Sequence, residues 1–472
     1  MEASNPIQRD LSWREALWIA LAGMVAFQLA YTYASCSFLI AVYLWSLFQL
    51  TRLATSRHAF YFGLGVGFAT CAPQAMFFWE IFGPAAIGLW CVLAFWIALF
   101  VSLGRLSRRE FGPLVGVVLL PFLWTGLEYF RSELYFLRFS WLSPGLAFAK
   151  TLSWLPMRYV GVYGIAFVIM TGISMCSLLS RKPQIYTSLG LLLYLGILTN
   201  LTPPRILNAS SLPSDLRVAG VQMEFPSELE ALDGLNKLVQ AFPQVRLLVL
   251  SECTFDGPVP EIVKNWCRKN QRYLIVGGKD AIDKTNYYNT AFVIGPDGTI
   301  IFKQAKCIPV QFFKDGLPAT GQKLWNSPWG KLGICICYDL SYSRVTDELV
   351  RLGAQAIIVP TMDVVDWGRH QHELHARIAP TRAAEYGLPI FRLASSGISQ
   401  AVNLDGRVLT TAPTPGEGAM LSTTLRLPGS GTIPPDRVMA RICVGVTAAA
   451  SVWFIFSCVR KRKISLENPN PL

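Results

Sequence analysis

The chain has 472 residues, of which 52% are hydrophobic and 15% are charged. So apolar an average excludes a single water-soluble domain, while the length suffices for two large units. The formal net charge of +12 does not indicate nucleic-acid binding, because the basic residues flank apolar segments and form no stripe interleaved with aromatic residues. The eleven cysteines form neither CxxC pairs nor a cluster with histidine, which argues against a metal site.

Apolar segments long enough to cross a bilayer, about 20 residues each, gather before residue 200 and again near the C-terminus. We predict about eight membrane spans. They cover residues 13–31, 33–50, 59–78, 82–103, 113–130, 160–179, 186–201 and 438–459. The first of them is not a cleavable signal peptide by pattern, since Arg14 and Glu15 lie at its start and it runs directly into a second span.

Basic residues cluster after every second predicted span. The clusters are Arg52 and Arg57; Arg105, Arg108 and Arg109; Arg181 and Lys182; and Arg460, Lys461, Arg462 and Lys463. Positive residues mark the cytoplasmic ends of spans, so a cytoplasmic N-terminus leaves the large loop domain outside. In a bacterium this is the periplasmic side of the inner membrane.

These observations predict four parts. Residues 1–205 form a transmembrane domain of seven helices, residues 214–430 form a periplasmic domain, residues 436–460 form the last span, and residues 461–472 form a cytoplasmic tail. The periplasmic part has the mixed composition of a globular domain and is long enough for a single core.

Within this part, short apolar runs alternate with helical patterns, which predicts a layered α/β domain. The predicted strands are 216–222, 246–250, 273–277, 290–294, 299–303, 333–337, 356–360 and 389–394. The predicted helices are 229–241, 259–270, 343–352 and 370–386. The four histidines, His58, His370, His372 and His375, are interpreted as helix-surface residues or as residues that support a site.

Reactive residues follow three of these strands. Glu252 follows a buried strand, where a carboxylate is costly to desolvate unless it is paired or works as an acid or base. Lys306 follows a hairpin, and a lysine there is ordinarily a solvated surface charge. Cys335 and Cys337 lie on the same face of a strand by period-two alternation, so the residues alone do not choose a nucleophile.

Glutamate, lysine and cysteine in this order on successive strand ends resemble the catalytic set of the nitrilase superfamily. The flanking spans are similar to those of the apolipoprotein N-acyltransferase family, which finishes bacterial lipoprotein maturation and has seven spans before its domain and one after. In the membrane part, residues 124–131, 139–142 and 161–164 resemble that family's motifs. Downstream of the cysteine, the matching residues are Gln371, His372, Ala376, Arg377, Arg382, Ala383, Ala384, Glu385, Pro389, Arg392, Ser396, Gly397, Ile398, Ser399, Asp405, Gly406 and Arg407.

The resemblance selects Lys306 as the catalytic lysine and Cys337 as the nucleophile. The chain also departs from the family in places. Phe313, Lys314 and Asp315 stand where Gly-Glu is usual, Asp339 stands where Glu is usual, and residues 361–363 replace a Ser-Asn-Asp motif. These departures concern substrate choice more than the catalytic set.

The resemblance implies an αββα sandwich and an acyltransferase with ping-pong kinetics. Glu252 would be the base, Lys306 would stabilise the oxyanion, and Cys337 would carry the acyl group as a thioester. The donor would be a membrane phospholipid and the acceptor the diacylglyceryl-cysteine of an apolipoprotein, with no metal or organic cofactor. Five further residues are expected to bind substrate or support the site: Tyr338, Asp339, Trp141, Phe312 and Phe313. Of these, Trp141, Phe312 and Phe313 are expected at its mouth, and the alternative is that these three belong to the belt of aromatic residues at the membrane interface.

Two other functions fit the same sequence. A membrane-tethered amidase or nitrilase-type hydrolase would use the same three residues, with water as the second nucleophile. A transport or structural protein with a decayed nitrilase-like domain is the non-enzymatic alternative. The presence of Glu252, Lys306 and Cys337 together argues against decay.

Overall fold

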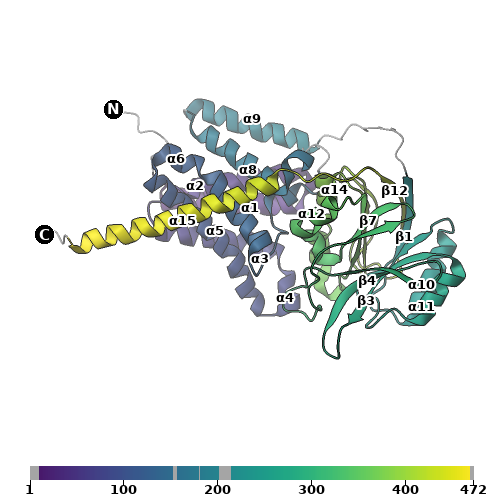
Figure 1. Cartoon of the computed structure of the whole chain (residues 1–472). Coiled ribbons are helices and arrows are strands. Elements are labelled where there is room, and N and C mark those ends of the chain that lie inside the picture. Colours follow the sequence, from purple (N-terminus) through teal and green to yellow (C-terminus); the bar gives the residue numbers. More distant parts are fainter. Residues whose placement is uncertain (1–9, 152–156, 180, 201–213, 468–472) are drawn as a thin grey trace. The chain divides into compact units, whose positions relative to one another are not determined.

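The computed structural model describes residues 10–151, 157–179, 181–200 and 214–467. The chain forms two compact units, which we call the helical unit and the sheet unit (Figure 1). The helical unit comprises Met1–Thr151, Val160–Thr202 and Pro435–Leu472, and the sheet unit comprises Leu152–Tyr159 and Pro203–Pro434. The predicted boundary at residues 205–214 lies almost entirely outside the described residues, as does part of the predicted tail.

Helices cover every segment that we predicted to span the membrane. In chain order, the elements are α1 (Trp13–Thr32), η1 (Ala34–Leu39), α2 (Ile40–Leu50), α3 (Ser56–Gln74), α4 (Phe77–Phe82), α5 (Ala85–Glu110), α6 (Gly112–Val118), α7 (Leu120–Tyr129), η2 (Phe130–Leu134), η3 (Pro144–Phe148), α8 (Met157–Ser177), α9 (Arg181–Asn200) and α15 (Asp436–Glu467). The kind of fold is therefore confirmed for this half of the chain.

Five segments of the described chain are long and apolar enough to cross a bilayer. They are Trp13–Thr32, Ala85–Glu110, Gly112–Leu134, Met157–Ser177 and Asp436–Lys461. Two shorter apolar helices, Ala34–Leu50 and Ile185–Ile197, lie within other predicted spans. The count of eight spans remains a prediction. The last span belongs to the same unit as the preceding ones, because α15 packs along α7, where the Thr447 hydroxyl donates to the Phe122 carbonyl at 3.2 Å.

Glycines on α3 allow a close crossing with α5. A Cβ atom on Gly67 would lie 2.7 Å from the Cα of Ala94, and one on Gly63 would lie 2.6 Å from the Cα of Ala98. Helices within a bilayer gain no hydrophobic free energy from packing together, so close backbone contact through small residues is a main source of their association. Gly65, between the two, has no neighbouring atom within 4 Å of such a Cβ.

A partly buried amide on α1 repairs a break in the hydrogen bonding of α3. Pro73 has no N–H for the carbonyl of Ala69, one turn earlier in the helix. The side-chain amide of Gln28 donates to that carbonyl at 3.0 Å, and Gln74 donates to the Gln28 oxygen at 2.6 Å. A free carbonyl would be costly in hydrocarbon, so Gln28 both satisfies α3 and fixes α1 against it.

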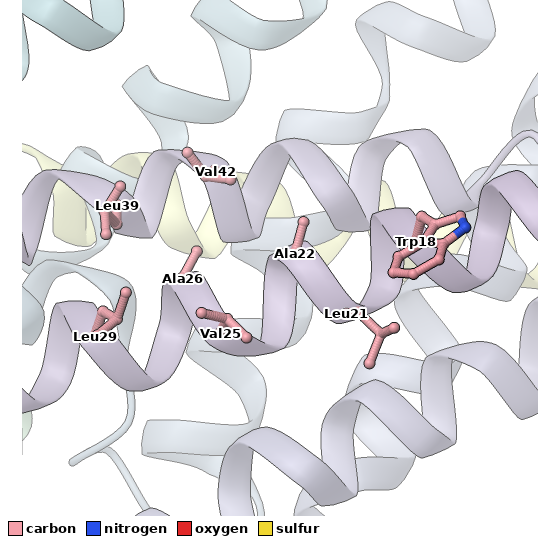
Figure 2. Close-up of a pocket in the computed structure, with 8 residues that line it drawn as sticks. All are labelled: Trp18, Leu21, Ala22, Val25, Ala26, Leu29, Leu39 and Val42. Atoms are coloured by element: carbon pink, nitrogen blue, oxygen red, sulfur yellow. The ribbon is translucent and has the colours of Figure 1, made fainter.

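An open apolar groove of about 470 Å³ lies along α1 (Figure 2). It is lined by Trp18, Leu21, Ala22, Val25, Ala26 and Leu29 of α1, with Leu39 and Val42 from the following helices. The Trp18 indole supplies the one polar atom among these side chains, as expected for a surface in contact with lipid tails.

The sheet unit contains two six-stranded sheets. One has the order β12-β1-β2-β3-β4-β5 and the other β11-β10-β9-β8-β7-β6. The strands are β1 (Ser214–Val221), β2 (Leu247–Val249), β3 (Tyr273–Ala281), β4 (Tyr287–Ile294), β5 (Ile300–Ala305), β6 (Leu324–Ser327), β7 (Gly330–Ile334), β8 (Ala356–Thr361), β9 (Ile390–Ala394), β10 (Ser399–Val402), β11 (Val408–Ala412) and β12 (Met420–Leu427). The pairs β1–β2, β2–β3, β7–β8 and β8–β9 are parallel.

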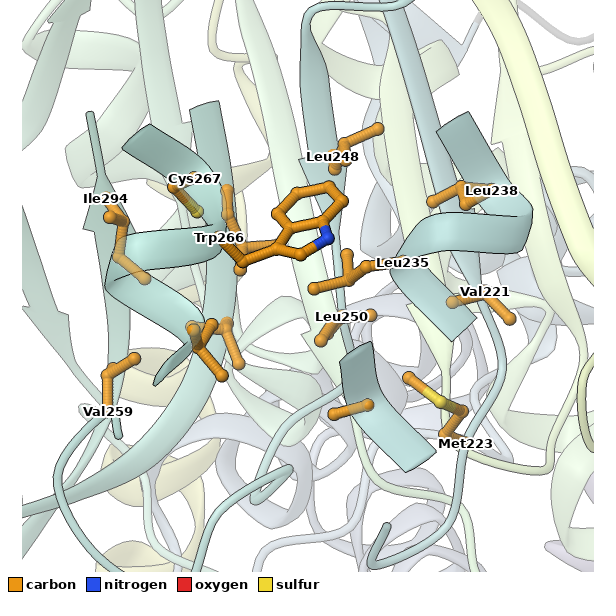
Figure 3. Packing of buried hydrophobic residues seen from close by; sticks show 14 of the residues in the cluster. Val221, Met223, Leu235, Leu238, Leu248, Leu250, Val259, Trp266, Cys267 and Ile294 are labelled. Atoms are coloured by element: carbon orange, nitrogen blue, oxygen red, sulfur yellow. The ribbon is translucent and has the colours of Figure 1, made fainter. Parts of the chain in front are cut away.

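Helices cover the outer faces of both sheets, which confirms the predicted αββα sandwich. On the first sheet, α10 (Glu228–Ala241) and α11 (Glu261–Asn270) bury a core around Trp266, Leu235 and Leu248 (Figure 3). On the second, α12 (Ser343–Arg351) and α14 (Ile378–Tyr386) pack against β7 and β9. The sheets meet between β1 and β9, so residues that follow β2 and β7 reach one interior region.

Three details of the predicted elements are wrong. The strand predicted at 333–337 ends at Ile334, and Cys337 begins a 3₁₀ turn, η5 (Cys337–Ser341). The helix predicted at 370–386 is divided into α13 (Gly368–His375) and α14, because Pro380 offers no N–H to the carbonyl one turn before it. Strands β6, β10, β11 and β12 were not predicted, since serine and threonine interrupt their apolar alternation.

The α3–α5 crossing yields a matched pair of substitutions. Gly67→Val forces the two helices apart, and overpacking of this kind costs about 1–3 kcal/mol. Gly65→Val adds the same side chain to the same helix where there is open space. In detergent, we expect a lower thermal unfolding midpoint for Gly67→Val than for Gly65→Val. Equal midpoints would contradict the close crossing.

Candidate active site

Glu252 lies just beyond β2, with its side chain buried. Three donors satisfy its carboxylate. Lys306 Nζ is 2.7 Å and Asn289 Nδ2 is 2.8 Å from Oε1, while the backbone N–H of Met362 donates to Oε2 at 2.9 Å. These bonds come from three separate segments of chain, so the position of the carboxylate is fixed from several sides.

Lys306 follows β5 and is only 1% exposed. Its ammonium lies between two carboxylates, at 2.7 Å from Glu252 Oε1 and 2.6 Å from Asp315 Oδ2. Burial alone would lower the pKa of Lys306, but the carboxylates of Asp315 and Glu252 outweigh it and hold that pKa well above its usual value. The side chain is therefore a permanent cation in a site from which water is excluded.

Asp315 and Asn289 were not predicted as site residues. Asn289 Nδ2 donates to both carboxylates, at 2.8 Å to Glu252 Oε1 and 2.7 Å to Asp315 Oδ1. Asp315 Oδ2 also accepts from the Val310 backbone N–H at 2.8 Å. The sequence offered one signal for Asp315, an acid close to the position where Gly-Glu is usual, and none for Asn289.

Cys337 sits at the first residue of η5 with φ +51°, a left-handed conformation that is unusual for a non-glycine residue. The hydrogen bonds between β7 and β8 continue as far as Cys335, whose N–H donates to the Ile358 carbonyl at 3.3 Å, and the chain then turns. Backbone strain of this kind gathers at functional sites. Cys337 is 5% exposed, whereas Cys335 is fully buried.

The peptide of Met362 contacts both reactive groups. Its N–H donates to Glu252 Oε2 at 2.9 Å, and its carbonyl accepts from the Cys337 thiol at 3.6 Å. Met362 follows β8, the strand between β7 and β9, so the sheet that carries the cysteine also holds the glutamate in place.

The electrostatic environment keeps the resting thiol protonated. Burial raises the pKa of Cys337 well above its usual value, and the Glu252 carboxylate raises it further, while Lys306 acts in the opposite direction. Because only the thiolate is a good nucleophile, attack requires removal of this proton, and Glu252 is the neighbouring carboxylate that can accept it.

Asp339 connects the cysteine turn to the lysine segment. Its buried carboxylate accepts backbone N–H groups from Cys307 at 3.1 Å, Ile308 at 2.7 Å and Ile336 at 3.3 Å. Burial raises the pKa of Asp339 to about 6, although Lys306 and these N–H groups favour the charged form. The hydrogen bonds of the Asp339 carboxylate thus go to backbone N–H groups, which suits the supporting role that we predicted for it better than substrate binding. The neighbouring Tyr338 is also buried, with its ring 4.9 Å from that of Tyr342.

The three predicted aromatic residues have different environments. Phe312 is 66% exposed at φ +71°, and Phe313 is partly exposed with its ring 5.9 Å from that of Trp367. Both lie on the loop between Lys306 and Asp315. Trp141 belongs to the helical unit, where it is buried against Phe77 and Phe139.

No group of three or more histidine, cysteine, aspartate or glutamate side chains is arranged to hold a metal ion in the described part of the chain. His372 and His375 are buried in α13. His375 Nδ1 lies 2.8 Å from Asp363 and 2.9 Å from Arg392, so it supports neighbouring side chains rather than facing solvent.

Asp339 provides a test of the link between the two segments. Asp339→Ala leaves three N–H groups without their acceptor, two of them buried, and each buried group costs about 1–3 kcal/mol. We expect a much lower unfolding midpoint for Asp339→Ala and a smaller loss for Asp339→Asn, which keeps one acceptor oxygen. The exposed Asp366→Ala is the control. If Asp339→Ala has the same unfolding midpoint as this control, the hydrogen bonds between the cysteine turn and the lysine segment do not stabilise the fold.

Two families match the chain, one in each unit. The carbon-nitrogen hydrolase family matches residues 240–433, which include Glu252, Lys306 and Cys337. The N-terminal domain of apolipoprotein N-acyltransferase matches residues 20–174. The first family alone is compatible with many amidases, whereas the second is specific to a membrane enzyme.

Curated relatives follow the same division. An apolipoprotein N-acyltransferase of Geobacter metallireducens is 26% identical, with 78% of this chain and 80% of that protein covered, and one of Shewanella oneidensis is 22% identical, with 87% and 90% covered. A deaminated glutathione amidase of Dictyostelium discoideum is 28% identical but matches only 33% of this chain and 62% of its own. The two matching domains, together with these long matches, support an apolipoprotein N-acyltransferase of the nitrilase superfamily.

Proposed function

We propose that this protein transfers a fatty acyl chain from a membrane phospholipid, through a thioester on Cys337, to the N-terminal amine of the diacylglyceryl-cysteine of lipoproteins. Lipoprotein N-acylation is the activity of its family. The observation that carries the chemical proposal is the placement of the Cys337 thiol and the Glu252 carboxylate on one peptide, that of Met362, beside the buried Lys306 cation.

In the first half-reaction, Glu252 takes the thiol proton as Cys337 Sγ attacks the carbonyl carbon of the phospholipid ester. A carbon–sulfur bond forms and the ester carbon–oxygen bond breaks. The proton held by Glu252 then passes to the departing glycerol oxygen, and a lysophospholipid leaves. The acyl group remains on Cys337 as a thioester.

Lys306 is proposed to stabilise the negative charge that develops on the carbonyl oxygen. Its ammonium is already fixed by Glu252 and Asp315, so it need not reorganise during the reaction, and this preorganisation is the usual source of large electrostatic rate enhancement. The high pKa of Lys306 suits it for this role rather than for proton transfer.

In the second half-reaction, the acceptor amine attacks the thioester carbonyl. Glu252 takes a proton from the amine, an amide bond forms, and the sulfur leaves and is reprotonated as the thiol. One base thus serves both halves. Because the lysophospholipid leaves before the amine reacts with the thioester, the kinetics are ping-pong. Neither half requires a cofactor.

The membrane spans suit this chemistry, because the donor and the lipid-modified acceptor both reside in the bilayer. We place the sheet unit on the periplasmic side of a bacterial inner membrane, on the basis of the basic residues that follow alternate predicted spans. The exposed Phe312 and Phe313, on the loop between Lys306 and Asp315, are proposed to contact lipid at the mouth of the site.

The hydrolase alternative uses the same groups with water as the acceptor. Its support is weaker, because the amidase relative matches only 33% of this chain, whereas the matches to the two apolipoprotein N-acyltransferases cover 78% and 87% of it. A soluble amide would also not require the apolar spans.

The thioester can be observed directly. Full-length protein incubated with phosphatidylethanolamine should gain one acyl group by intact mass, the adduct should be released by hydroxylamine, and it should transfer to a diacylglyceryl-cysteine peptide. Cys337→Ala should abolish the adduct. Cys335→Ala, a substitution two residues away, should retain it.

Two results would contradict the proposal. An adduct that persists in Cys337→Ala would assign the wrong nucleophile. An adduct that discharges to water and leaves the peptide unmodified would establish the hydrolase alternative.

Asp315 has a measurable role in this scheme. Asp315→Asn removes one of the two charges that hold the Lys306 ammonium, so the cation is less well fixed for the transition state. We expect Cys337 acylation to slow by about 10- to 100-fold, within the range for the loss of a single electrostatic contribution. Lys314→Ala, at the exposed neighbouring residue, should acylate within about twofold of wild type. Equal acylation rates in the two variants would show that Asp315 does not contribute to the reaction.

A further inference from the structure

A second buried charge cluster lies directly behind Met362. Asp363 is fully buried, and Oδ2 is 2.5 Å from Arg392 Nη2. Oδ1 accepts from Gln371 at 3.1 Å and lies 2.8 Å from His375 Nδ1. The donors come from β9 and α13, so the cluster joins separate elements of the sheet unit. No step of the proposed mechanism uses these side chains.

The cluster fixes the backbone on which Met362 lies. The Asp363 N–H donates to Ser395 Oγ at 3.1 Å, and Ser395 Oγ donates to the Asp363 carbonyl at 3.1 Å. Arg392 also donates to the Ile398 carbonyl. A Cβ atom on Gly397 would lie 2.4 Å from Asp363 Oδ2, so the carboxylate has no room to move in that direction. The peptide that contacts Glu252 and Cys337 is therefore held from behind.

The charges of the cluster are balanced. Burial alone would raise the pKa of Asp363, but His375 and Arg392 outweigh it and hold that pKa well below its usual value. Burial lowers the pKa of His375 against the attraction of Asp363, and Arg392 lowers it further. At neutral pH the aspartate is negative, the arginine positive and His375 neutral.

The balance matters because the charge of Asp363 acts on the Cys337 thiol. The charged groups that act on the Cys337 thiol are Glu252, Lys306 and Asp363. The charged group beside Asp363 is Arg392, and the titratable groups near it are His375 and His372. An uncompensated negative charge at Asp363 would disfavour the thiolate, and an uncompensated positive charge at Arg392 would favour it.

We infer that Asp363 and Arg392 are positioning residues, which hold the Met362 peptide against Glu252 and Cys337 and keep the region behind the thiol free of net charge. As a statement about catalysis, the inference rests on the proposed function. As a statement about the thiol, it can be tested without any lipid.

Two substitutions that break the same ion pair should act on the thiol in opposite directions. Asp363→Asn leaves Arg392 positive, and Arg392→Gln leaves Asp363 negative. A residue that serves only to stabilise the fold would give effects of one sign, because both variants lose the same contact. The sign of the effect therefore separates an electrostatic role from a merely structural one.

The experiment measures the rate of alkylation of Cys337 by iodoacetamide in the full-length protein, by mass spectrometry of the Cys337 peptide, between pH 7 and 9. Since one pKa unit changes the thiolate fraction about tenfold in this range, we expect Asp363→Asn to react roughly 3- to 10-fold faster than wild type and Arg392→Gln slower by a similar factor. Tyr386→Phe, which removes a buried hydrogen bond to Asp347 elsewhere in the unit, should change the rate by less than about twofold.

Arg392→Lys covers the case in which Arg392→Gln fails to fold. It keeps the charge but loses the forked geometry, so alkylation should stay near the wild-type rate while acyl transfer falls with little change in KM. Alkylation shifts of the same sign in Asp363→Asn and Arg392→Gln, or no shift in either folded variant, would overturn the inference. If the two variants change the alkylation rate in opposite directions but the wild-type protein shows no acyl transfer, the electrostatic role of Asp363 and Arg392 is supported and the proposed function is rejected.

Discussion

The interaction on which the site depends is the burial of one ammonium between two carboxylates. A lysine that is almost inaccessible to water is tolerated only if its charge is paired, and Lys306 is paired twice, with Glu252 and Asp315. The two carboxylates are themselves poorly accessible to water, so each needs further hydrogen-bond donors. Asn289 bridges the two carboxylates, and the backbone of Val310 and Met362 completes them. The loop with the exposed phenylalanines is thus anchored at both ends.

The environment of Cys337 keeps its thiol protonated at rest. Burial raises the pKa of this thiol and the Glu252 carboxylate raises it further, while Lys306 acts in the opposite direction. In the proposed mechanism, a thiol that stays protonated at rest reacts only when a carbonyl is placed for attack and Glu252 takes the proton in the same step. The strained φ of Cys337 and the balanced Asp363–Arg392 pair define where that thiol lies.

Much of this could be predicted from the sequence, for identifiable reasons. Glu252 and Lys306 follow strands with clear apolar patterns, and the order of the three reactive residues carried the family resemblance. Asn289, Asp315 and Met362 could not be found in this way, because they enter through hydrogen bonds between segments distant in sequence. Asn289 lies inside a strand, and Met362 contributes its backbone, which no side-chain pattern reveals. The turn at Cys337 was missed because period-two alternation continues through Cys335 and gives no sign of a left-handed residue.

The fold shows a similar division. Long apolar segments and strands such as β3 and β8 follow from hydrophobic patterning alone, whereas β12 is paired with β1 across some two hundred residues and carries too many threonines to stand out. Helix packing in the membrane half depends on glycines at particular spacings, and on Gln28 opposite Pro73, which hydropathy does not register. Element types were therefore accessible from local pattern, while the contacts that fix their positions were not.

The central claim is that a buried Cys337 receives the acyl chain and holds it until an amine arrives. The most direct measurement is the amount of lysophospholipid released per protein molecule in the absence of acceptor. The account predicts a rapid release that stops near one equivalent and resumes when a diacylglyceryl-cysteine peptide is added. Continuous release without acceptor, or release that does not depend on Cys337, would contradict it.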